Sequence, residues 1–281
     1  MRFIRCFRND VRQGILREWY YFMPILVLAV IFCIDFYRRT NSICNYLGYQ
    51  GNRCFLDYVI FIFGGMQEYF PSPDNSFLFP AIWIVTTGYA SFLTLRYPYD
   101  DLEGYGQQII LKAGKRSRWW MSKCLWMCAK TLFYYILIYL VILLCCKVMG
   151  GTAAGYPDPF FIEKIFYIKA GSMPREFQDI LLLLFLPFLM SLTINMVQLV
   201  LGLLCGVAFS FLVSLILLVG SAYYLNPVML GNGGMLIRSS LINVAGLDPR
   251  LVILIYICIW VVALIFGMYW FQRKDILRKE D

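Results

Sequence analysis

The feature that most limits how this chain can fold is residues 179–225, a run whose one charged side chain is Asp179 at its start. As one helix, this run would measure about 70 Å, more than twice the ~30 Å hydrocarbon thickness of a bilayer. It therefore predicts two membrane-crossing helices, 179–201 and 203–225, with a tight turn near Gly202. Across the chain, 60% of the 281 residues are hydrophobic and 15% are charged. Because a soluble domain needs a more charged exterior, we expect an integral membrane protein.

Four further apolar stretches have the length and composition of membrane-crossing helices. The apolar stretch 55–66 predicts a re-entrant or interfacial helix, and 226–249 predicts a pair of short re-entrant pieces, both on the extracellular side. Residues 160–170 form a short amphipathic stretch suited to the membrane surface. The expected fold is all-α and polytopic, with six transmembrane helices and residues 1–281 as one transmembrane domain. The four additional spans are predicted at residues 20–37, 78–96, 124–148 and 250–271.

Residues 1–19 form an amphipathic segment ahead of the first span. Apolar side chains recur there every three to four residues, which predicts one helix with an apolar stripe flanked by arginines. We expect this interfacial helix to lie on the cytoplasmic leaflet with its apolar side down. A signal peptide is the alternative, but the basic region is long and no small-residue cleavage site follows the first span.

The distribution of lysine and arginine predicts the orientation of the chain. More than half of its 25 basic residues lie in three short segments, 1–19, 96–123 and 272–281. Basic segments stay on the cytoplasmic side, so both termini are expected there, in a multi-pass protein of the cell membrane. We interpret the net charge of +8 as a signal that orients the chain in the membrane and attracts anionic lipids of the bilayer. We do not interpret it as a sign of nucleic-acid binding.

The chain contains no histidine, which excludes Ser-His nucleophiles, His-ligated zinc and histidine-ligated haem. No cysteine or carboxylate cluster shares a depth and a face, so we expect no catalytic residue, no metal site and no cofactor site in this chain. Most of the ten cysteines lie in apolar runs, where thiols behave as small hydrophobic groups. Cys44 and Cys54 lie outside the spans, and they are either free or joined by a disulfide.

Residues 97–123 separate the second and third predicted spans, and they are too long for a turn and too short for a domain. The spacing Asp100-x-x-Glu103 is typical of a capping box, so we expect a short helix to start there. Gly114 suits the end of that helix. Its acidic start is formed by Asp100, Asp101 and Glu103, and its apolar edge is formed by Ile109, Ile110 and Leu111.

The sequence Gly114-Lys115-Arg116-Ser117 superficially resembles the end of a phosphate-binding loop. That loop needs a glycine five residues before Gly114 and Ser or Thr directly after the lysine. Ile109 and Arg116 occupy those positions, and no strand precedes them. This route to ATP binding is therefore excluded.

The chain resembles the type 2 family of ATP-binding-cassette (ABC) exporter permeases over nearly all of its length. The resemblance rests on the amphipathic start, the six spans, the loop YPYDDLEGYGQQIILKAGKRSRWWMSK and the short apolar stretches before the last span. It implies that residues 97–123 are a coupling helix seated on a separate ATPase subunit. It also implies a second permease subunit, identical or different, and ATP with Mg²⁺ in the partner ATPase. This chain would then be a non-catalytic permease subunit.

Polar side chains within the predicted spans are candidates for lining a transport path. Thr86, Thr87, Asn195 and Gln198 are such candidates, although helix packing explains them as well. Aromatic richness favours an amphipathic or hydrophobic cargo, such as an antimicrobial peptide. The alternatives are a non-transporting membrane subunit (an immunity or sensory protein), a secondary transporter, and a membrane-embedded enzyme.

Overall fold

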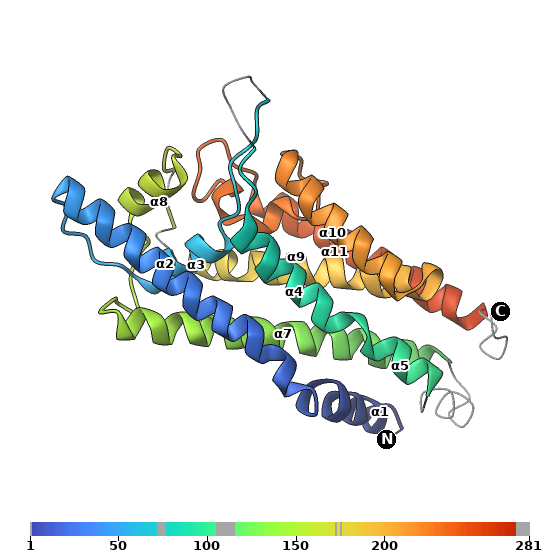
Figure 1. The fold of residues 1–281 in the computed structure, drawn as a ribbon. Helices are drawn as coiled ribbons and strands as arrows, with labels where there is room; N and C mark the ends of the chain where they lie inside the picture. The colour runs from blue at the N-terminus through green and yellow to red at the C-terminus, as the bar shows by residue number, and fades with distance from the viewer. Residues whose placement is uncertain (1, 72–76, 105–115, 172, 175, 274–281) are drawn as a thin grey trace.

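The structure is a computed structural model of the whole chain. It describes all residues except 1, 72–76, 105–115, 172, 175 and 274–281. The described part is a bundle of α-helices without named β-strands, as the sequence predicts (Figure 1). The helices are α1 (Arg2–Val11), α2 (Met23–Leu47), α3 (Phe55–Phe63), α4 (Ala81–Leu95), α5 (Tyr97–Glu103), α7 (Arg116–Val148), α8 (Pro159–Phe166), α9 (Phe177–Cys205), α10 (Val207–Tyr223) and α11 (Pro249–Arg273).

Four helical stretches in the described residues are long and apolar enough to cross a membrane. They are Trp19–Leu47, Arg116–Val148, Phe177–Cys205 and Pro249–Arg273. α10 is also apolar but shorter, and α4 has 15 residues. The long helices extend beyond the predicted spans because charged residues at their ends, such as Arg116 and Arg273, continue the helical backbone outside the apolar run.

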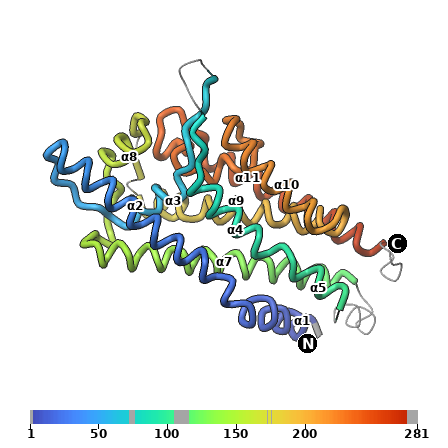
Figure 2. The backbone as a smooth tube through the Cα atoms, in the orientation of Figure 1, coloured from blue at the N-terminus to red at the C-terminus, as the bar shows by residue number. Residues whose placement is uncertain are grey.

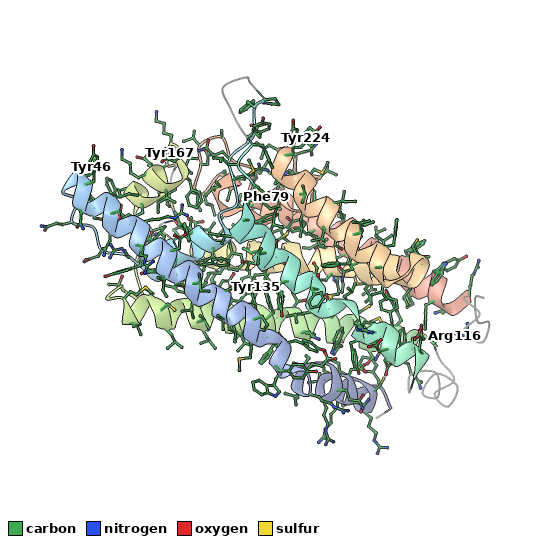
Figure 3. The ribbon with its side chains drawn as sticks, viewed as in Figure 1. Tyr46, Phe79, Arg116, Tyr135, Tyr167 and Tyr224 are labelled. Carbon is green, nitrogen blue, oxygen red and sulfur yellow. The ribbon has the colours of Figure 1, made fainter. Side chains whose placement is uncertain are left out.

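The elements gather at two opposite ends of the bundle (Figures 1 and 2). α1, α5, the start of α7 and the end of α11 lie together at what we call the terminal end. Trp119 of α7 stacks on Phe271 of α11 there, with ring centroids 4.7 Å apart. α3, α8 and the turns that precede α11 lie at the far end. Figure 3 places Arg116 at the terminal end and Tyr46 and Tyr167 at the far end.

The turn between α9 and α10 falls at Gly206, not at Gly202 as the sequence predicted. Gly206 has φ +93°, a conformation that favours glycine. Gly202 instead lies inside α9, where the hydroxyl of Tyr99 from α5 occupies the space that a Cβ would need. Glycine at 202 therefore serves close helix packing, and glycine at 206 makes the turn.

The amino-terminal segment is divided where one helix was predicted. α1 ends at Val11, a wide π-turn follows over Arg12–Leu16, and a 3₁₀ turn covers Trp19–Phe22 before α2 begins. The division turns Asp10 and Ile15 inward, so that both are buried against the bundle. Ile4 and Leu16 stay exposed, as an apolar side that faces lipid would be.

The far end contains the predicted short apolar helix as α3, and almost all of α3 is buried. Asp57 in its first turn accepts hydrogen bonds from the backbone N–H groups of Cys54 and Asp158, both at 2.8 Å. Burial raises the pKa of Asp57 to about 6, although these two N–H groups oppose the shift. Asp158 in turn caps α8, the predicted surface helix.

The region 226–249 forms 3₁₀ turns and loops instead of the predicted re-entrant helices. Arg238 organises it, because its buried guanidinium donates to five oxygen atoms and none of them belongs to a carboxylate. We call this group the Arg238 knot. The acceptors are the carbonyls of Met66 (2.8 Å), Gln67 (2.8 Å), Ser221 (2.6 Å) and Ala222 (2.8 Å), and the side-chain oxygen of Asn232.

Ser221 and Ala222 lie in the last turn of α10, where carbonyl groups lack helical partners. A cation at this position also suits the negative end of the helix dipole. Burial lowers the pKa of Arg238 to about 10, so the side chain stays charged at neutral pH.

Candidate functional site

A buried ionic cluster at the terminal end joins three helices. Lys123 of α7 is fully buried, and its Nζ lies 2.6 Å from Oδ1 of Asp10 and 2.7 Å from Oδ2 of Asp101. Asp10 belongs to α1 and Asp101 to α5. One side chain therefore holds the amino-terminal helix, the acidic helix and the start of the longest helix together.

Neutral donors complete the coordination of both carboxylates. Asp10 accepts from the hydroxyls of Tyr97 (2.9 Å) and Ser122 (2.5 Å), and Asp101 accepts from Nε1 of Trp119 (2.8 Å). Burial, with help from the two carboxylates, raises the pKa of Tyr97, which keeps its hydroxyl protonated as a donor. We call this group the lysine cluster, and its members are Asp10, Tyr97, Asp101, Trp119, Ser122 and Lys123.

The lysine cluster has one cation for two carboxylates and lies away from water. Taking ions out of water costs several kcal/mol each, which a single ion pair does not fully offset. The additional donors offset part of that cost, and Nζ of Lys123 also lies 4.6 Å from the ring centroid of Tyr97. Removing one partner from such a group is expensive, because the remaining charge stays buried.

A second buried ion pair lies further along α7. Nζ of Lys130 is 2.7 Å from Oε2 of Glu18, and the lysine side chain is only 2% exposed. Lys123 and Lys130 are seven residues apart, which is two helical turns, so both lie on the same face of α7. Asp10 and Glu18 of the amino-terminal segment supply an acid to each lysine.

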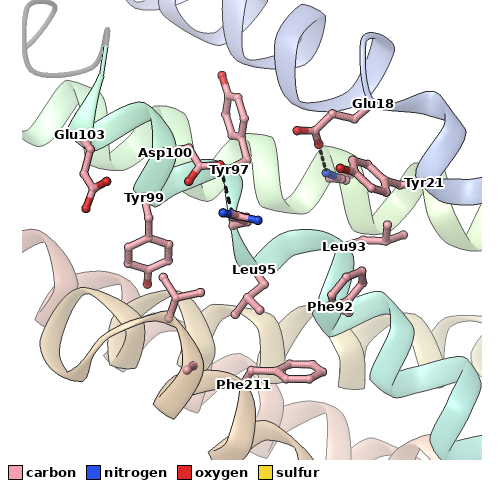
Figure 4. Close-up of a pocket in the computed structure, with 14 residues that line it drawn as sticks. Glu18, Tyr21, Phe92, Leu93, Leu95, Tyr97, Tyr99, Asp100, Glu103 and Phe211 are labelled. Atoms are coloured by element: carbon pink, nitrogen blue, oxygen red, sulfur yellow. Dashed lines mark hydrogen bonds and ion pairs between the residues drawn. The ribbon is translucent and has the colours of Figure 1, made fainter.

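A cleft of about 730 Å³ lies beside these ion pairs, between the amino-terminal segment, α4, α5 and α10. Figure 4 shows Glu18 and Tyr21 on one side and Phe211 of α10 on the other. The dashed lines in Figure 4 mark the Glu18–Lys130 pair and an exposed pair of Arg96 with Asp100 at 3.6 Å.

The three predicted acidic residues of the coupling segment differ in their surroundings. Asp101 is buried in the lysine cluster, whereas Asp100 and Glu103 are exposed and line the cleft. The predicted capping box is wrong, because α5 already begins at Tyr97 and Asp100 lies within it. Pro98 explains the earlier start, since proline suits the first turn of a helix. The predicted apolar edge, Ile109, Ile110 and Leu111, lies outside the described residues.

The four path candidates are all buried between helices, and none lines the cleft. Thr86 and Thr87 donate to carbonyls one turn earlier in α4, each at 2.7 Å. Asn195 of α9 joins Ser91 of α4 (2.8 Å) to Thr131 of α7 (3.1 Å). Gln198 donates to the Ser91 carbonyl at 2.9 Å. These contacts place them in helix packing, and their role in a path stays a prediction.

Cys44 and Cys54 are free thiols in the structure. Cys54 is buried, and its Sγ donates to the carbonyl of Tyr156 at 3.3 Å. Cys44 lies in the last turn of α2 and is partly exposed. A disulfide between them stays a prediction.

Sequence reasoning missed the partners of the buried lysines. Asp10 and Glu18 fall in the predicted surface helix, and Lys123 ends the predicted basic segment. The sequence contained one signal of this pairing. Asp10 and Glu18 lie eight residues apart before the first predicted span, and two lysines seven residues apart, Lys123 and Lys130, lie on one face of an apolar helix. A lysine at membrane depth demands a carboxylate from elsewhere in the bundle.

These features define an all-helical protein with several helices able to cross a membrane and a buried ionic cluster at one end. The chain belongs to the family described as protein of unknown function DUF2705, which it matches over residues 26–277. The matched region includes Asp101 and Lys123 and begins after Asp10 and Glu18. No curated protein and no solved structure matches the chain.

Proposed function

We propose that this chain is the membrane-spanning permease subunit of an ATP-driven exporter whose ATPase is a separate chain. The observation that carries the proposal is the lysine cluster, which ties the two ends of residues 97–123 together. Asp101 lies near the start of this segment and Lys123 closes it. A force applied to the segment would therefore reach α7 directly and α1 through Asp10.

The arrangement of helix ends supports six membrane crossings with both termini on the cytoplasmic side. α1, α5, the start of α7 and the end of α11 share the terminal end, as an even number of crossings requires (Figure 1). α10 has 17 residues, the lower limit for a span. α4 is shorter, and the predicted span 78–96 adds apolar residues such as Leu78 and Phe79 before it.

In this proposal ATP and Mg²⁺ bind in the partner ATPase. This chain supplies the pathway and the segment, residues 97–123, that transmits the motion of the ATPase to the membrane helices. A second permease subunit completes the pathway. The cleft at the terminal end exposes Asp100 and Glu103, which belong to the proposed docking segment 97–123. The aromatic and apolar lining of the cleft, which includes Phe92 and Phe211, suits an amphipathic or hydrophobic cargo such as an antimicrobial peptide.

The test is a search of the neighbouring genes for an ABC ATPase, then co-expression of that ATPase with this chain, purification and measurement of ATP hydrolysis; absence of such a gene would weaken the proposal. Ile110→Asp places a charge on the predicted docking edge, so we expect loss of copurification and of cargo-stimulated hydrolysis. Val228→Asp at the exposed far end is the control and should behave as wild type. Normal hydrolysis and normal copurification of Ile110→Asp would disprove the docking role. Copurification of wild type without any cargo stimulation would instead favour a non-transporting subunit.

A further inference from the structure

A groove of about 430 Å³ lies at the far end, between residues 38–43 of α2 and the last turn of α8. Three cationic side chains line it: Arg38 and Arg39 of α2 and Lys164 of α8. Among the described residues, no carboxylate belongs to its lining. In a chain whose basic residues gather mostly at the other end, this concentration of positive charge is unusual.

The lining also combines polar and apolar groups, as a site for an amphipathic ligand would. Ser42 and Tyr167 contribute hydroxyl groups, and Ile43 and Ile165 contribute apolar surface. Tyr167 is 86% exposed at the rim of the groove (Figure 3). The groove can therefore offer hydrogen-bond donors and cations to a polar head and aliphatic contacts to an apolar tail.

Two of the three cations are not used by the fold. Arg39 pairs with Asp35 at 3.0 Å, but Arg38 and Lys164 have no carboxylate at salt-bridge distance in the described residues. Arg53, also at the far end, differs, because it donates to Thr40 at 2.7 Å and lies over an aromatic ring. Arg38 and Lys164 therefore keep their charge available for a ligand.

The α8 wall of the groove is held in place by contacts outside the groove. Tyr49 stacks on Phe160 with ring centroids 3.8 Å apart and donates its hydroxyl to Asp158 at 2.9 Å. Phe161 of α8 packs against Phe36 of α2. Because these contacts fix α8 against α2, the groove exists without a ligand, as binding sites usually do.

The position of the groove along α2 corresponds to lipid headgroups. The apolar run that starts at Tyr20 ends at Tyr37, just before Arg38. That run is about 27 Å long at helical rise, close to the hydrocarbon thickness of a bilayer. Arginine and lysine at that depth meet phosphate groups, and arginine binds phosphate through two parallel hydrogen bonds.

We infer that this groove binds the phosphate of an anionic lipid headgroup, with Arg38 and Lys164 as its principal cations. The isoleucines contact the glycerol and the first acyl carbons. Basic pockets between membrane helices on the cytoplasmic side bind lipid phosphates in this manner, and this groove offers the same contacts at the opposite surface. The assignment does not depend on the proposed exporter function, since a non-transporting subunit would carry the same groove.

The test is native mass spectrometry of the purified full-length chain titrated with dimyristoyl phosphatidylglycerol or dimyristoyl phosphatidylcholine. These lipids have the same acyl chains and differ in net charge. We expect Arg38→Gln/Lys164→Gln to lower phosphatidylglycerol affinity about tenfold and to leave the weak phosphatidylcholine binding unchanged. The matched control is Lys147→Gln/Lys169→Gln, which removes two exposed cations that do not line the groove.

Three results would overturn the inference. The groove variant could bind phosphatidylglycerol as tightly as wild type, or the control variant could lose as much affinity as the groove variant. Alternatively, inorganic phosphate in excess could displace the lipid completely, which would identify a site for free phosphate. Circular dichroism of both variants verifies the fold, and the exposed positions of these side chains make folding of the variants the expected result.

Discussion

The two ends of the molecule bury ions in different ways. At the terminal end, Lys123 and Lys130 are neutralised by carboxylates on other elements. At the far end, the charge of Arg238 is met by carbonyls and one amide oxygen, and the charge of Asp57 is met by two backbone N–H groups. The buried cations of the terminal end are hydrogen-bonded to counter-ions, whereas Arg238 and Asp57 at the far end are hydrogen-bonded to backbone and amide groups, with Glu68 acting on Arg238 only through its charge.

This difference predicts different mechanical behaviour. Backbone dipoles are fixed by the course of the chain, so Arg238 can lose them only if the loops around it unfold. Counter-ions on separate helices can part and pair again as whole helices move. We therefore expect the elements of the far end to move as one rigid unit. At the terminal end we expect α1, α5 and α7 to move relative to one another. Substitutions at the buried ions of each end test this contrast.

The largest effect is expected for Lys123→Met. This substitution leaves the carboxylates of Asp10 and Asp101 buried without their cation, and we expect a loss of about 4 kcal/mol in unfolding free energy. Equilibrium unfolding by SDS in mixed micelles measures it. Lys147→Met, at an exposed position of the same helix, is the control and should change stability by less than about 0.5 kcal/mol.

The triple variant Asp10→Asn/Asp101→Asn/Lys123→Met sharpens this prediction. It removes all three charges, so it should recover at least half of the stability that Lys123→Met loses. A triple variant no more stable than the single one would show that the fold needs the shape of the cluster and not its charge balance.

A smaller loss of unfolding free energy, about 3 kcal/mol, is expected for Arg238→Lys. Lysine keeps the charge but has three donors in place of five, so at least two buried oxygens lose their partner. The same unfolding assay measures the loss, with Arg250→Lys at an exposed site as the control. If Arg238→Lys were as stable as wild type, charge alone would hold the loops, and the contrast between the two ends would be wrong.

The smallest effect concerns pH and Asp57. Its folded-state pKa of about 6 lies above its ordinary value, so the carboxyl favours folding most below pH 4, and this contribution is lost as the pH rises through 6. Wild type should gain about 1 kcal/mol between pH 7 and pH 5 relative to Asp57→Asn, which lacks the titrating group. Parallel pH profiles for the two proteins would contradict the prediction.

Sequence alone predicted the apolar helices well because hydrophobic length is a local property. The short helix at 55–66 and the surface helix at 160–170 were predicted for the same reason, and they correspond to α3 and α8. The turn at Gly206 was not predicted. Which of the two glycines forms the turn depends on the packing of Tyr99 of α5 against Gly202. Composition does not reveal which glycine a distant helix will contact.

The candidate site was predicted only in part. Asp101 was identified, but Lys123 and Asp10 are 113 residues apart in sequence, and their pairing follows from the packing of α1 against α7. The capping pattern at Asp100 was misleading because Pro98 starts the helix earlier. The Arg238 knot could not be predicted from the sequence, because most of its acceptors are backbone carbonyls, which every residue type has.

The pairing of the lysines with the amino-terminal segment has a consequence for biosynthesis. Asp10 and Glu18 leave the ribosome more than 100 residues before Lys123 and Lys130. A lysine that enters a bilayer alone is costly, but Lys130 of the third predicted span would enter where the carboxylate of Glu18 already lies, and Lys123 would meet Asp10 at the membrane surface. The amino-terminal segment thus precedes the third predicted span and can receive it, and a chain in which Asp10 and Glu18 were replaced would be expected to stall at the insertion of that span.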